Sequence, residues 1–287
     1  MQPVVYLNGQ LLPLEQAFIS PLDYGFLYGY GLFETMRAYG GSVFRLQQHI
    51  ERLQDSTEKL AIPPLDYDLP DAVYQTLKAN QLSDARLRLA VSVGPGGMTP
   101  DTRQCRQPTV LVTAAAYQPY PEAVYNTGFK VIISSLVRYS QSPLSAIKSA
   151  NYLENMLARR EAVAAGADES LRLNEHGCLA EASMSNVFLV LDGNLTTPSL
   201  DSGILPGITR QAVIEIAQSL SIAVSEREVT REELLRAQEA FLTNSLIGIM
   251  PLTAIDGQAV ADSQPGPITQ RLMSAYSELV ASETGRA

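Results

Sequence analysis

The stretch SPLSAIKSANYLENML, residues 142–157, sets one lysine among small and apolar neighbours where an extended segment meets a helix. Lys148 is one of four lysines in the chain, and the other three lie in contexts typical of the surface. An arbitrary lysine more often covers apolar surface with its methylenes while its ammonium reaches water. A functional lysine is partly desolvated, which lowers its pKa and lets the neutral amine attack a carbonyl. Small neighbours would leave room for a bulky cofactor, so Lys148 is a candidate nucleophile.

A carboxylate stands in a similar setting further along the chain. Glu181 interrupts the run GCLAEASMSNVFLV, residues 177–190, whose members are mostly apolar or small. Burying a carboxylate without a partner is costly, so Glu181 is either an edge-strand residue that faces water or a buried acid with a partner. In the second case it can serve as the counter-ion of a cationic ring nitrogen.

A candidate anion site lies in DSGILPGITRQAVIEIA, residues 201–217. Two glycines bracket a tight loop, after which Ile208 and Thr209 begin a predicted helix. The backbone N–H groups and the dipole of a helix start attract anions, and Thr209 adds a hydroxyl donor. A simple capped helix start is the more common use of such a sequence.

Further donors could reach the same anion. The segment FLTNSLIGIMP, residues 241–251, places Thr243 and Ser245 at the end of a predicted strand. Arg52 lies on an amphipathic helix, where it is either a phosphate ligand or a solvated arginine. Together these residues would supply an amine, a buried acid and an anion-binding site, which are the three contacts that pyridoxal phosphate requires.

The composition narrows the classes of protein. The 287-residue chain carries a net charge of −9, which argues against nucleic-acid binding and against a polybasic membrane-surface protein. No apolar run approaches the ~20 residues that cross a bilayer, and the N-terminus MQPVVYLNGQ lacks the pattern of a secretory signal. Two cysteines and two histidines are scattered along the chain, so no metal site is expected. We expect a cytoplasmic globular protein.

Short strands alternate with amphipathic helices along the chain, which predicts an α+β fold. A proline-containing linker around 117–123 suggests two domains, residues 1–120 and 121–287. We expect helices near 46–60, 71–80, 151–165, 208–220, 230–237 and 267–282. We expect hairpin turns at Asn8-Gly9, Gly40-Gly41 and Asp192-Gly193, and a strand over 129–137.

An ordered set of motifs makes the chain resemble a known family. These motifs are YLNGQ, YGFLYGYGLFETMRAY, IKSANYL, LAEASMSNVFLV, LTTPSLDSGILPGITRQAV and FLTNSLIGIMPLTAIDG. The chain resembles, over nearly its whole length, the class IV (fold type IV) pyridoxal-phosphate enzymes, which include branched-chain aminotransferases, D-amino acid aminotransferases and 4-amino-4-deoxychorismate lyases. The resemblance implies a D-amino acid aminotransferase-like fold with a smaller α/β N-terminal domain and a pseudo-barrel C-terminal domain. It also implies pyridoxal 5'-phosphate as the cofactor, a small-molecule amino substrate and a homodimer.

The resemblance implies a role for each candidate residue. Lys148 would hold the cofactor aldehyde and later move a proton, Glu181 would meet the pyridine nitrogen, and Tyr152 would lie near the phenolic oxygen. The implied phosphate contacts are Arg52, the amides of Ile208 and Thr209, and the side chain of Ser245. Position 245 is often threonine in the transaminases.

The motifs divide between subfamilies. Thr35 in GLFETMRAY and the sequence FLTNS at 241–245 resemble the lyases, because branched-chain enzymes usually have glycine at the first position and Gly-Thr-Ala in the second motif. The leading interpretation is therefore a 4-amino-4-deoxychorismate lyase, which releases pyruvate and gives 4-aminobenzoate for folate synthesis. The alternative is a transaminase that acts on branched-chain L-amino acids or D-amino acids with a 2-oxo acid acceptor. A third hypothesis is a non-catalytic module of the same fold.

The substrate carboxylate has several candidate ligands. The loop GPGGMTPDT, residues 94–102, lacks the Arg-x-His pair of well-known D-amino acid enzymes, although Arg88 or Arg103 could replace it. Arg86 and Arg88 share one face of their predicted strand. Tyr30 stands where the family often has aspartate, so it could alter the pocket or a dimer contact.

Overall fold

The computed structural model describes residues 2–285, and its backbone divides into two compact units. Within the described range the N-terminal unit comprises the chain up to Gln118, Ile147–Asn151 and the chain from Val280 onward. The C-terminal unit comprises Pro119–Ala146 and Tyr152–Leu279. The division into domains at residues 120 and 121 stays a prediction, because a compact unit need not fold on its own.

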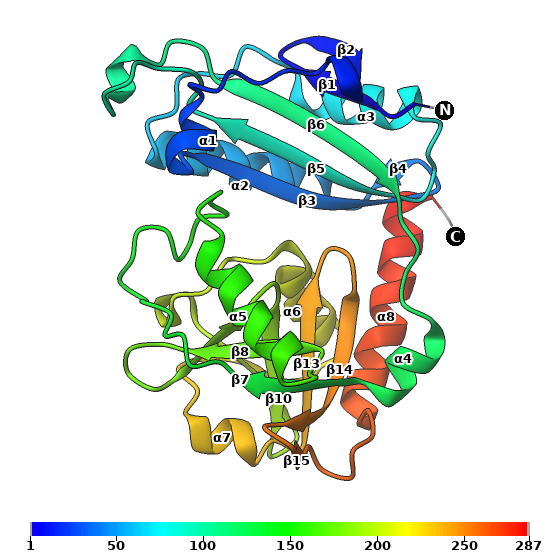
Figure 1. Cartoon of the computed structure of the whole chain (residues 1–287). Helices are drawn as coiled ribbons and strands as arrows, with labels where there is room; N and C mark the ends of the chain where they lie inside the picture. The colour runs from blue at the N-terminus through cyan, green and yellow to red at the C-terminus, as the bar shows by residue number, and fades with distance from the viewer. Residues whose placement is uncertain (1, 286–287) are drawn as a thin grey trace. The chain divides into compact units, whose positions relative to one another are not determined.

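An antiparallel sheet forms the N-terminal unit, with strand order β2-β1-β6-β5-β3-β4 (Figure 1). Its strands are β1 (Val4–Leu7), β2 (Gln10–Pro13), β3 (Gly31–Tyr39), β4 (Ser42–Val43), β5 (Ala85–Ser92) and β6 (Thr109–Ala116). The expected hairpins are present, since β1 pairs with β2 and β3 with β4. Asn8 and Gly9 both have positive φ, at 48° and 90°, as a two-residue hairpin turn requires.

Helices cover one face of this sheet. They are α2 (Leu46–Lys59) and α3 (Leu69–Ala79), and the short helices η1 (Leu14–Gln16), α1 (Tyr24–Tyr28) and η2 (Thr102–Gln104) lie in loops. Alternation along β3 sends Leu32, Met36 and Ala38 into the core with residues of α2 and α3. The odd-numbered residues of β3, among them Phe33, therefore point to the opposite face.

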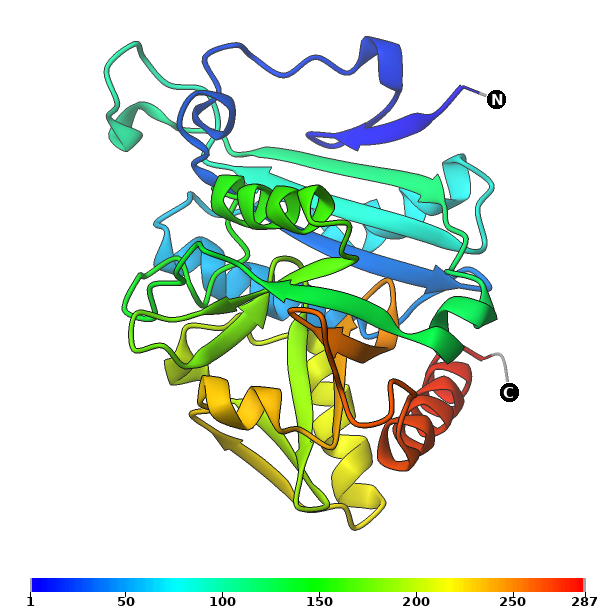
Figure 2. The ribbon, with the colours of Figure 1, turned by 60° about the horizontal axis from the view of Figure 1, so that its bottom comes forward.

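A mixed sheet forms the C-terminal unit, with strand order β12-β11-β10-β13-β14-β7-β8-β9 and β15 beside β14. Figure 2 shows its strands, coloured from green to orange along the chain. Its strands are β7 (Phe129–Ile133), β8 (Glu169–Leu173), β9 (Leu179–Ala182), β10 (Asn186–Leu191), β11 (Asn194–Pro198), β12 (Val224–Arg227), β13 (Glu239–Asn244), β14 (Gly248–Ile255) and β15 (Gln258–Ala259). The strand expected over 129–137 ends at Ile133, and an irregular segment follows it. This segment contains Arg138.

Helices pack against several strands of the second sheet. The helices of this part of the chain are α4 (Glu122–Thr127), α5 (Leu153–Ala164), η3 (Leu200–Ser202), α6 (Ile208–Ser219), α7 (Arg231–Leu235) and α8 (Pro267–Thr284). Helix α6 packs against β13 and β12, and α5 packs against β8. Over residues 2–285 no helix is both long enough and apolar enough to cross a membrane.

Candidate active site

The backbone around Lys148 is held against the first residues of β3. The Phe33 N–H donates to the Lys148 carbonyl at 3.0 Å, and the Ala150 N–H donates to the Gly31 carbonyl at 2.8 Å. Ser149 therefore forms an isolated bridge with Leu32. These bonds fix the lysine at the start of β3, although it is far from that strand in sequence.

An aromatic ring lies next to the lysine ammonium. Lys148 Nζ is 4.6 Å from the centroid of the Phe33 ring, and the Arg88 guanidinium carbon is 3.8 Å from the same centroid. A ring face attracts cations through its quadrupole. Phe33 thus brings an amine and a guanidinium to one place within the N-terminal unit.

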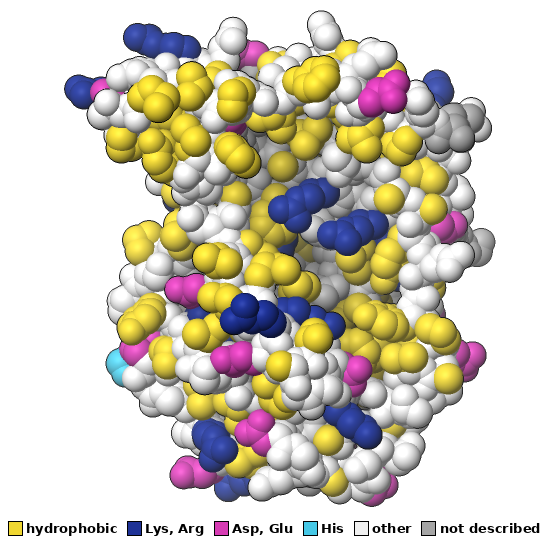
Figure 3. Space-filling view, viewed as in Figure 1, with side chains coloured by type: hydrophobic (Ala, Val, Ile, Leu, Met, Phe, Trp, Pro, Cys, Tyr) yellow, Lys and Arg dark blue, Asp and Glu magenta, His cyan; other side chains and the backbone are white. Residues whose placement is uncertain are grey.

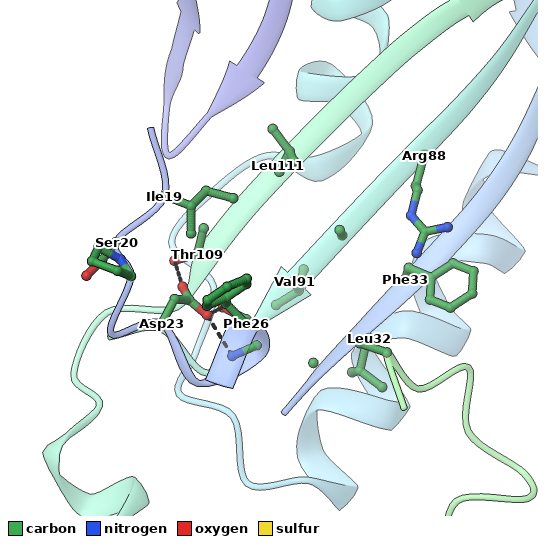
Figure 4. Close-up of a pocket in the computed structure, with 16 residues that line it drawn as sticks. Ile19, Ser20, Asp23, Phe26, Leu32, Phe33, Arg88, Val91, Thr109 and Leu111 are labelled. Carbon is green, nitrogen blue, oxygen red and sulfur yellow. Dashed lines mark hydrogen bonds between the residues drawn. The ribbon is translucent and has the colours of Figure 1, made fainter. Parts of the chain in front are cut away.

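A cavity of about 470 Å³ opens beside these residues (Figure 4). Leu32, Phe33, Arg88 and Ala150 contribute to its lining, together with apolar residues such as Phe26. Figure 4 shows Arg88 lying beside the ring of Phe33 at one end of the cavity. Cavities of this size are typical of small-molecule sites, which are mostly apolar with a few placed polar groups.

One acid at this cavity is already satisfied. Asp23 is buried and accepts hydrogen bonds from the Gly25 N–H at 2.7 Å, Ser92 Oγ at 2.6 Å and Thr109 Oγ1 at 2.6 Å. These bonds cap α1 and tie it to β5 and β6. Asp23 is therefore a structural residue of the cavity wall.

The candidate carboxylate ligands lie in different places. Arg88 lines the cavity, whereas Arg86 is exposed two residues away on the same strand face. Arg103 is exposed and pairs with Asp101 at 2.8 Å. Tyr30 donates from its hydroxyl to the Leu60 carbonyl at 2.6 Å and packs against the core of the N-terminal unit.

Arg52 belongs to a buried cluster that the sequence did not reveal. Its Nε donates to Glu34 Oε1 at 2.8 Å and its Nη2 to Glu34 Oε2 at 2.5 Å, while His49 Nδ1 lies 2.7 Å from the same Oε2. Burial raises the pKa of Glu34, but the charge of Arg52 and the hydrogen bond with His49 outweigh it and lower that pKa to about 2. Burial also lowers the pKa of His49, although Glu34 opposes this shift.

Glu181 is buried and paired in the C-terminal unit. Its Oε1 lies 3.0 Å from Arg138 Nη2, and its Oε2 accepts the Leu205 N–H at 3.0 Å. Arg138 also donates to the carbonyls of Gly203 at 2.8 Å and Ser145 at 2.7 Å. Of the two interpretations of Glu181, the structure supports the buried acid with a partner, which the sequence did not identify as Arg138.

The side chain of Tyr152 is held by Ser183, which lies two residues after Glu181 in the sequence. Tyr152 Oη donates to the Ser183 carbonyl at 3.2 Å, and Asn155 Nδ2 donates to the same carbonyl at 2.6 Å. Burial raises the pKa of Glu169, which accepts a hydrogen bond from the Ser183 hydroxyl. A buried polar network therefore fixes the tyrosine beside β9.

The start of α6 has the features of an anion site. Gly207 is its N-cap, and the side chains of the described residues provide no cap hydrogen bond. A Cβ at Gly207 would lie 2.0 Å from Asn186 Oδ1, so the loop approaches β10 as only glycine allows. Asn186 Nδ2 in turn donates to the Leu205 carbonyl at 2.9 Å.

A threonine hydroxyl without a hydrogen-bond partner among the described residues lies on the sheet face that carries Asn186. Thr243 is opposite Asn186 in the β10–β13 ladder, and its buried Oγ1 has no hydrogen-bond partner within residues 2–285. Opposite residues of a ladder project to the same side. Thr209 is buried in the first turn of α6, and Ser245 follows β13 directly. Uncapped amides and a spare hydroxyl fit the phosphate of pyridoxal phosphate.

The predicted site residues are thus divided between the two units. Lys148 and Arg52 belong to the N-terminal unit, and Tyr152, Glu181, Ile208, Thr209 and Ser245 belong to the C-terminal unit. Leu205 links two of these elements, because its N–H meets Glu181 and its carbonyl meets Asn186 beside the start of α6. The role of each residue toward the cofactor stays a prediction.

Comparisons with known proteins agree on the family. Residues 31–255 match the family described as Amino-transferase class IV. A Methanocaldococcus jannaschii protein that bears the provisional name of a branched-chain-amino-acid aminotransferase is 38% identical over 96% of each chain. The aminodeoxychorismate lyase of Bacillus subtilis is 36% identical over 95% of this chain and 93% of its own.

A solved structure agrees in fold. The branched-chain amino acid aminotransferase of T.th. with pyridoxamine 5'-phosphate has a TM-score of 0.93 and 33% identity, covering 100% of this chain and 96% of its own. Most of the relatives are branched-chain aminotransferases, so the comparisons favour our alternative interpretation over the lyase. The chain belongs to the class IV aminotransferase family and is a fold type IV enzyme with pyridoxal phosphate as its cofactor.

Proposed function

We propose that the protein is an aminotransferase that moves the amino group of branched-chain L-amino acids to a 2-oxo acid. The observation that carries this proposal is the apolar cavity lined by Phe33 and Arg88, together with the contact of the Lys148 ammonium with the same Phe33 ring. An aliphatic side chain fits apolar walls, and a guanidinium fits a carboxylate. The similarity to branched-chain aminotransferases supports the same substrate class. A D-amino acid specificity is less favoured, because the loop at 94–102 lacks the Arg-x-His pair.

Each residue has a defined task in this reaction. When bound, pyridoxal phosphate supplies an aldehyde that takes up the substrate amine and a cationic ring that draws electrons from the substrate carbon. Lys148 would hold that aldehyde and would move a proton at the substrate carbon as a general base and acid. Glu181, which pairs with Arg138, would keep the proton on the ring nitrogen. Arg88 orients the substrate carboxylate at the cavity.

The remaining residues position the cofactor. Tyr152 would lie near the phenolic oxygen, and its hydroxyl, which here donates to the Ser183 carbonyl, would turn to donate to that oxygen instead. The Ile208 and Thr209 amides at the start of α6 would hold the phosphate. Arg52 and Ser245 complete this set of donors.

A transfer assay tests the proposal. The purified holoenzyme, given L-leucine and 2-oxoglutarate, should form L-glutamate. Lys148→Ala should abolish the product, whereas Lys130→Ala, which removes an exposed lysine, should leave the rate unchanged. Absence of L-glutamate with L-leucine, L-isoleucine and L-valine would contradict the proposal. Protein that stays colourless after incubation with pyridoxal phosphate would instead support a non-catalytic module.

The lyase remains a second candidate because of Thr35. This residue lies opposite Arg88 in the β3–β5 ladder, on the strand face that carries Phe33. Branched-chain enzymes usually have glycine there, and a hydroxyl beside a guanidinium suits a more polar substrate. The Bacillus subtilis lyase is also 36% identical. Release of pyruvate from 4-amino-4-deoxychorismate, without amino transfer, would establish this activity.

We also propose a homodimer. Large apolar side chains gather on the face of the N-terminal unit around α1 (Figure 3), where Phe18 is 81% and Phe26 is 78% exposed. Exposed apolar patches of this kind commonly mark protein interfaces. Light scattering should report twice the chain mass, and Phe26→Glu should shift the protein toward the monomer. A monomeric native protein would contradict this proposal.

A further inference from the structure

Glu34 is a buried carboxylate with apolar neighbours on the helix-covered face of the N-terminal sheet. It lies between Leu32 and Met36 in the alternation of β3, and its exposed fraction is 1%. Core packing alone does not require such a residue, because an apolar side chain of similar size often serves stability as well or better. We therefore expect a role of Glu34 that depends on its negative charge.

Helix α2 presents two side chains to this carboxylate. His49 and Arg52 are one turn apart, so they share a face of the helix. The two nitrogens of Arg52 meet the two oxygens of Glu34 in a fork, and His49 holds Oε2 from the other side. Such a two-point contact fixes the plane of a guanidinium as well as its position.

We infer that Glu34 is a positioning residue, which with His49 fixes the plane of Arg52 for contact with the cofactor phosphate. The inference rests on the proposed phosphate contact of Arg52. A guanidinium that is already held loses less side-chain freedom when the phosphate binds, so binding is tighter. The charge of Glu34 thus acts on the cofactor only through Arg52.

The ratio of two affinities isolates this effect. We would strip the cofactor from the full-length protein and titrate it with pyridoxal 5'-phosphate and with pyridoxal, which lacks the phosphate. Glu34→Gln should weaken binding of the phosphate form by about 10-fold and of pyridoxal by less than about twofold, as expected for one charge-assisted contact. The control is Glu51→Gln, which removes an equal charge from the exposed face of the same helix and should change neither affinity.

Two outcomes would overturn the inference. Native affinity of Glu34→Gln for the phosphate form would show that the carboxylate is not needed, and an equal loss for both ligands would indicate a general structural defect. Arg52→Ala tests the phosphate contact of Arg52 by itself. If this variant leaves the affinity ratio unchanged, Arg52 does not contact the phosphate. A lowered ratio in Arg52→Ala with a native ratio in Glu34→Gln would overturn the positioning role alone.

A second variant keeps the test decisive if Glu34→Gln does not fold by circular dichroism. Arg52→Lys keeps the positive charge and loses the planar fork. We expect it to lose most of the preference for the phosphate form while its affinity for pyridoxal stays native. A native ratio in Arg52→Lys would show that the plane set by Glu34 is unimportant, which would contradict the inference.

Discussion

Each unit of the protein buries one glutamate against one arginine, yet the two pairs are built differently. In the N-terminal unit Arg52 meets both oxygens of Glu34, and titratable His49 shares the carboxylate. In the C-terminal unit Arg138 meets only one oxygen of Glu181, and the other accepts a backbone N–H. Backbone carbonyls hold Arg138 in turn.

We propose that a different member of each pair acts on the cofactor. In our account the first pair presents a cation, because Glu34 fixes Arg52, and the second presents an anion, because Arg138 fixes Glu181. In this proposal the same kind of ion pair presents a cation in one unit and an anion in the other. Replacing each member of a pair separately should distinguish the residue that contacts the cofactor from the residue that positions it.

Loss of an arginine should have the largest effect on stability in the C-terminal pair. Arg138→Met leaves the charge of Glu181 buried without a cationic partner, which should cost roughly 3–5 kcal/mol in the free energy of unfolding. Arg52→Met should cost less, because His49 remains beside Glu34 and can take up a proton. Urea denaturation of both variants measures the contrast. Equal losses would show that His49 does not compensate.

Acid should weaken the N-terminal pair over a defined range of pH. The folded pKa of Glu34 is about 2, below the ordinary value of 4.5, so its stabilisation is complete above 4.5 and is lost as the pH falls toward 2. This loss should amount to roughly 3 kcal/mol. The pKa of His49 is lowered from 6.5, so the folded state binds this proton less readily than the unfolded state. His49 therefore also lowers the stability as the pH falls below 6.5. Glu34→Gln should flatten the lower part of the stability curve, and an unchanged acid slope would contradict the shift.

Loss of the C-terminal carboxylate should slow turnover without preventing cofactor binding. Glu181→Gln keeps the shape of the side chain but cannot hold a proton on the ring nitrogen, so kcat should fall on the order of 100-fold. Cofactor content, measured by absorbance, should stay close to native. Glu232→Gln on an exposed helix is the control. Full activity of Glu181→Gln would remove the counter-ion role.

A neutral contact should have the smallest effect. Tyr152→Phe removes one hydroxyl that is anchored on Ser183, so kcat should fall by about fivefold, the value of one ordinary hydrogen bond. Tyr74→Phe, at a half-exposed position on α3, is the control. A loss as large as that of Glu181→Gln would mean that Tyr152 itself takes part in proton transfer.

Local patterns predicted most of the elements, and they also nominated the candidate site residues, whose roles stay predictions. Glycine pairs marked hairpins, apolar periodicity marked α2 and α6, and the setting of Lys148 marked a site. These signals depend on neighbours in sequence, where period and turn chemistry act directly. The resemblance to class IV enzymes then identified the family.

Contacts between distant segments could not be predicted in the same way. Arg138 is 43 residues from Glu181 and follows a strand that ends earlier than the apolar pattern suggested. Glu34 did carry a signal, since it interrupts an apolar alternation, but only the fold brings α2 over β3 and gives it partners. The choice between transaminase and lyase depends on a few positions such as Thr35, where sequence pattern has least force.

The most direct test is an absorption spectrum of the yellow holoenzyme before and after L-leucine is added without any oxo acid. We expect rapid loss of the visible band of the bound cofactor, because the amino group stays on the cofactor when no acceptor is present. Subsequent addition of 2-oxoglutarate should restore the band. A band that persists with L-leucine, L-isoleucine, L-glutamate and D-alanine, while 4-amino-4-deoxychorismate yields pyruvate, would contradict the aminotransferase and establish the lyase.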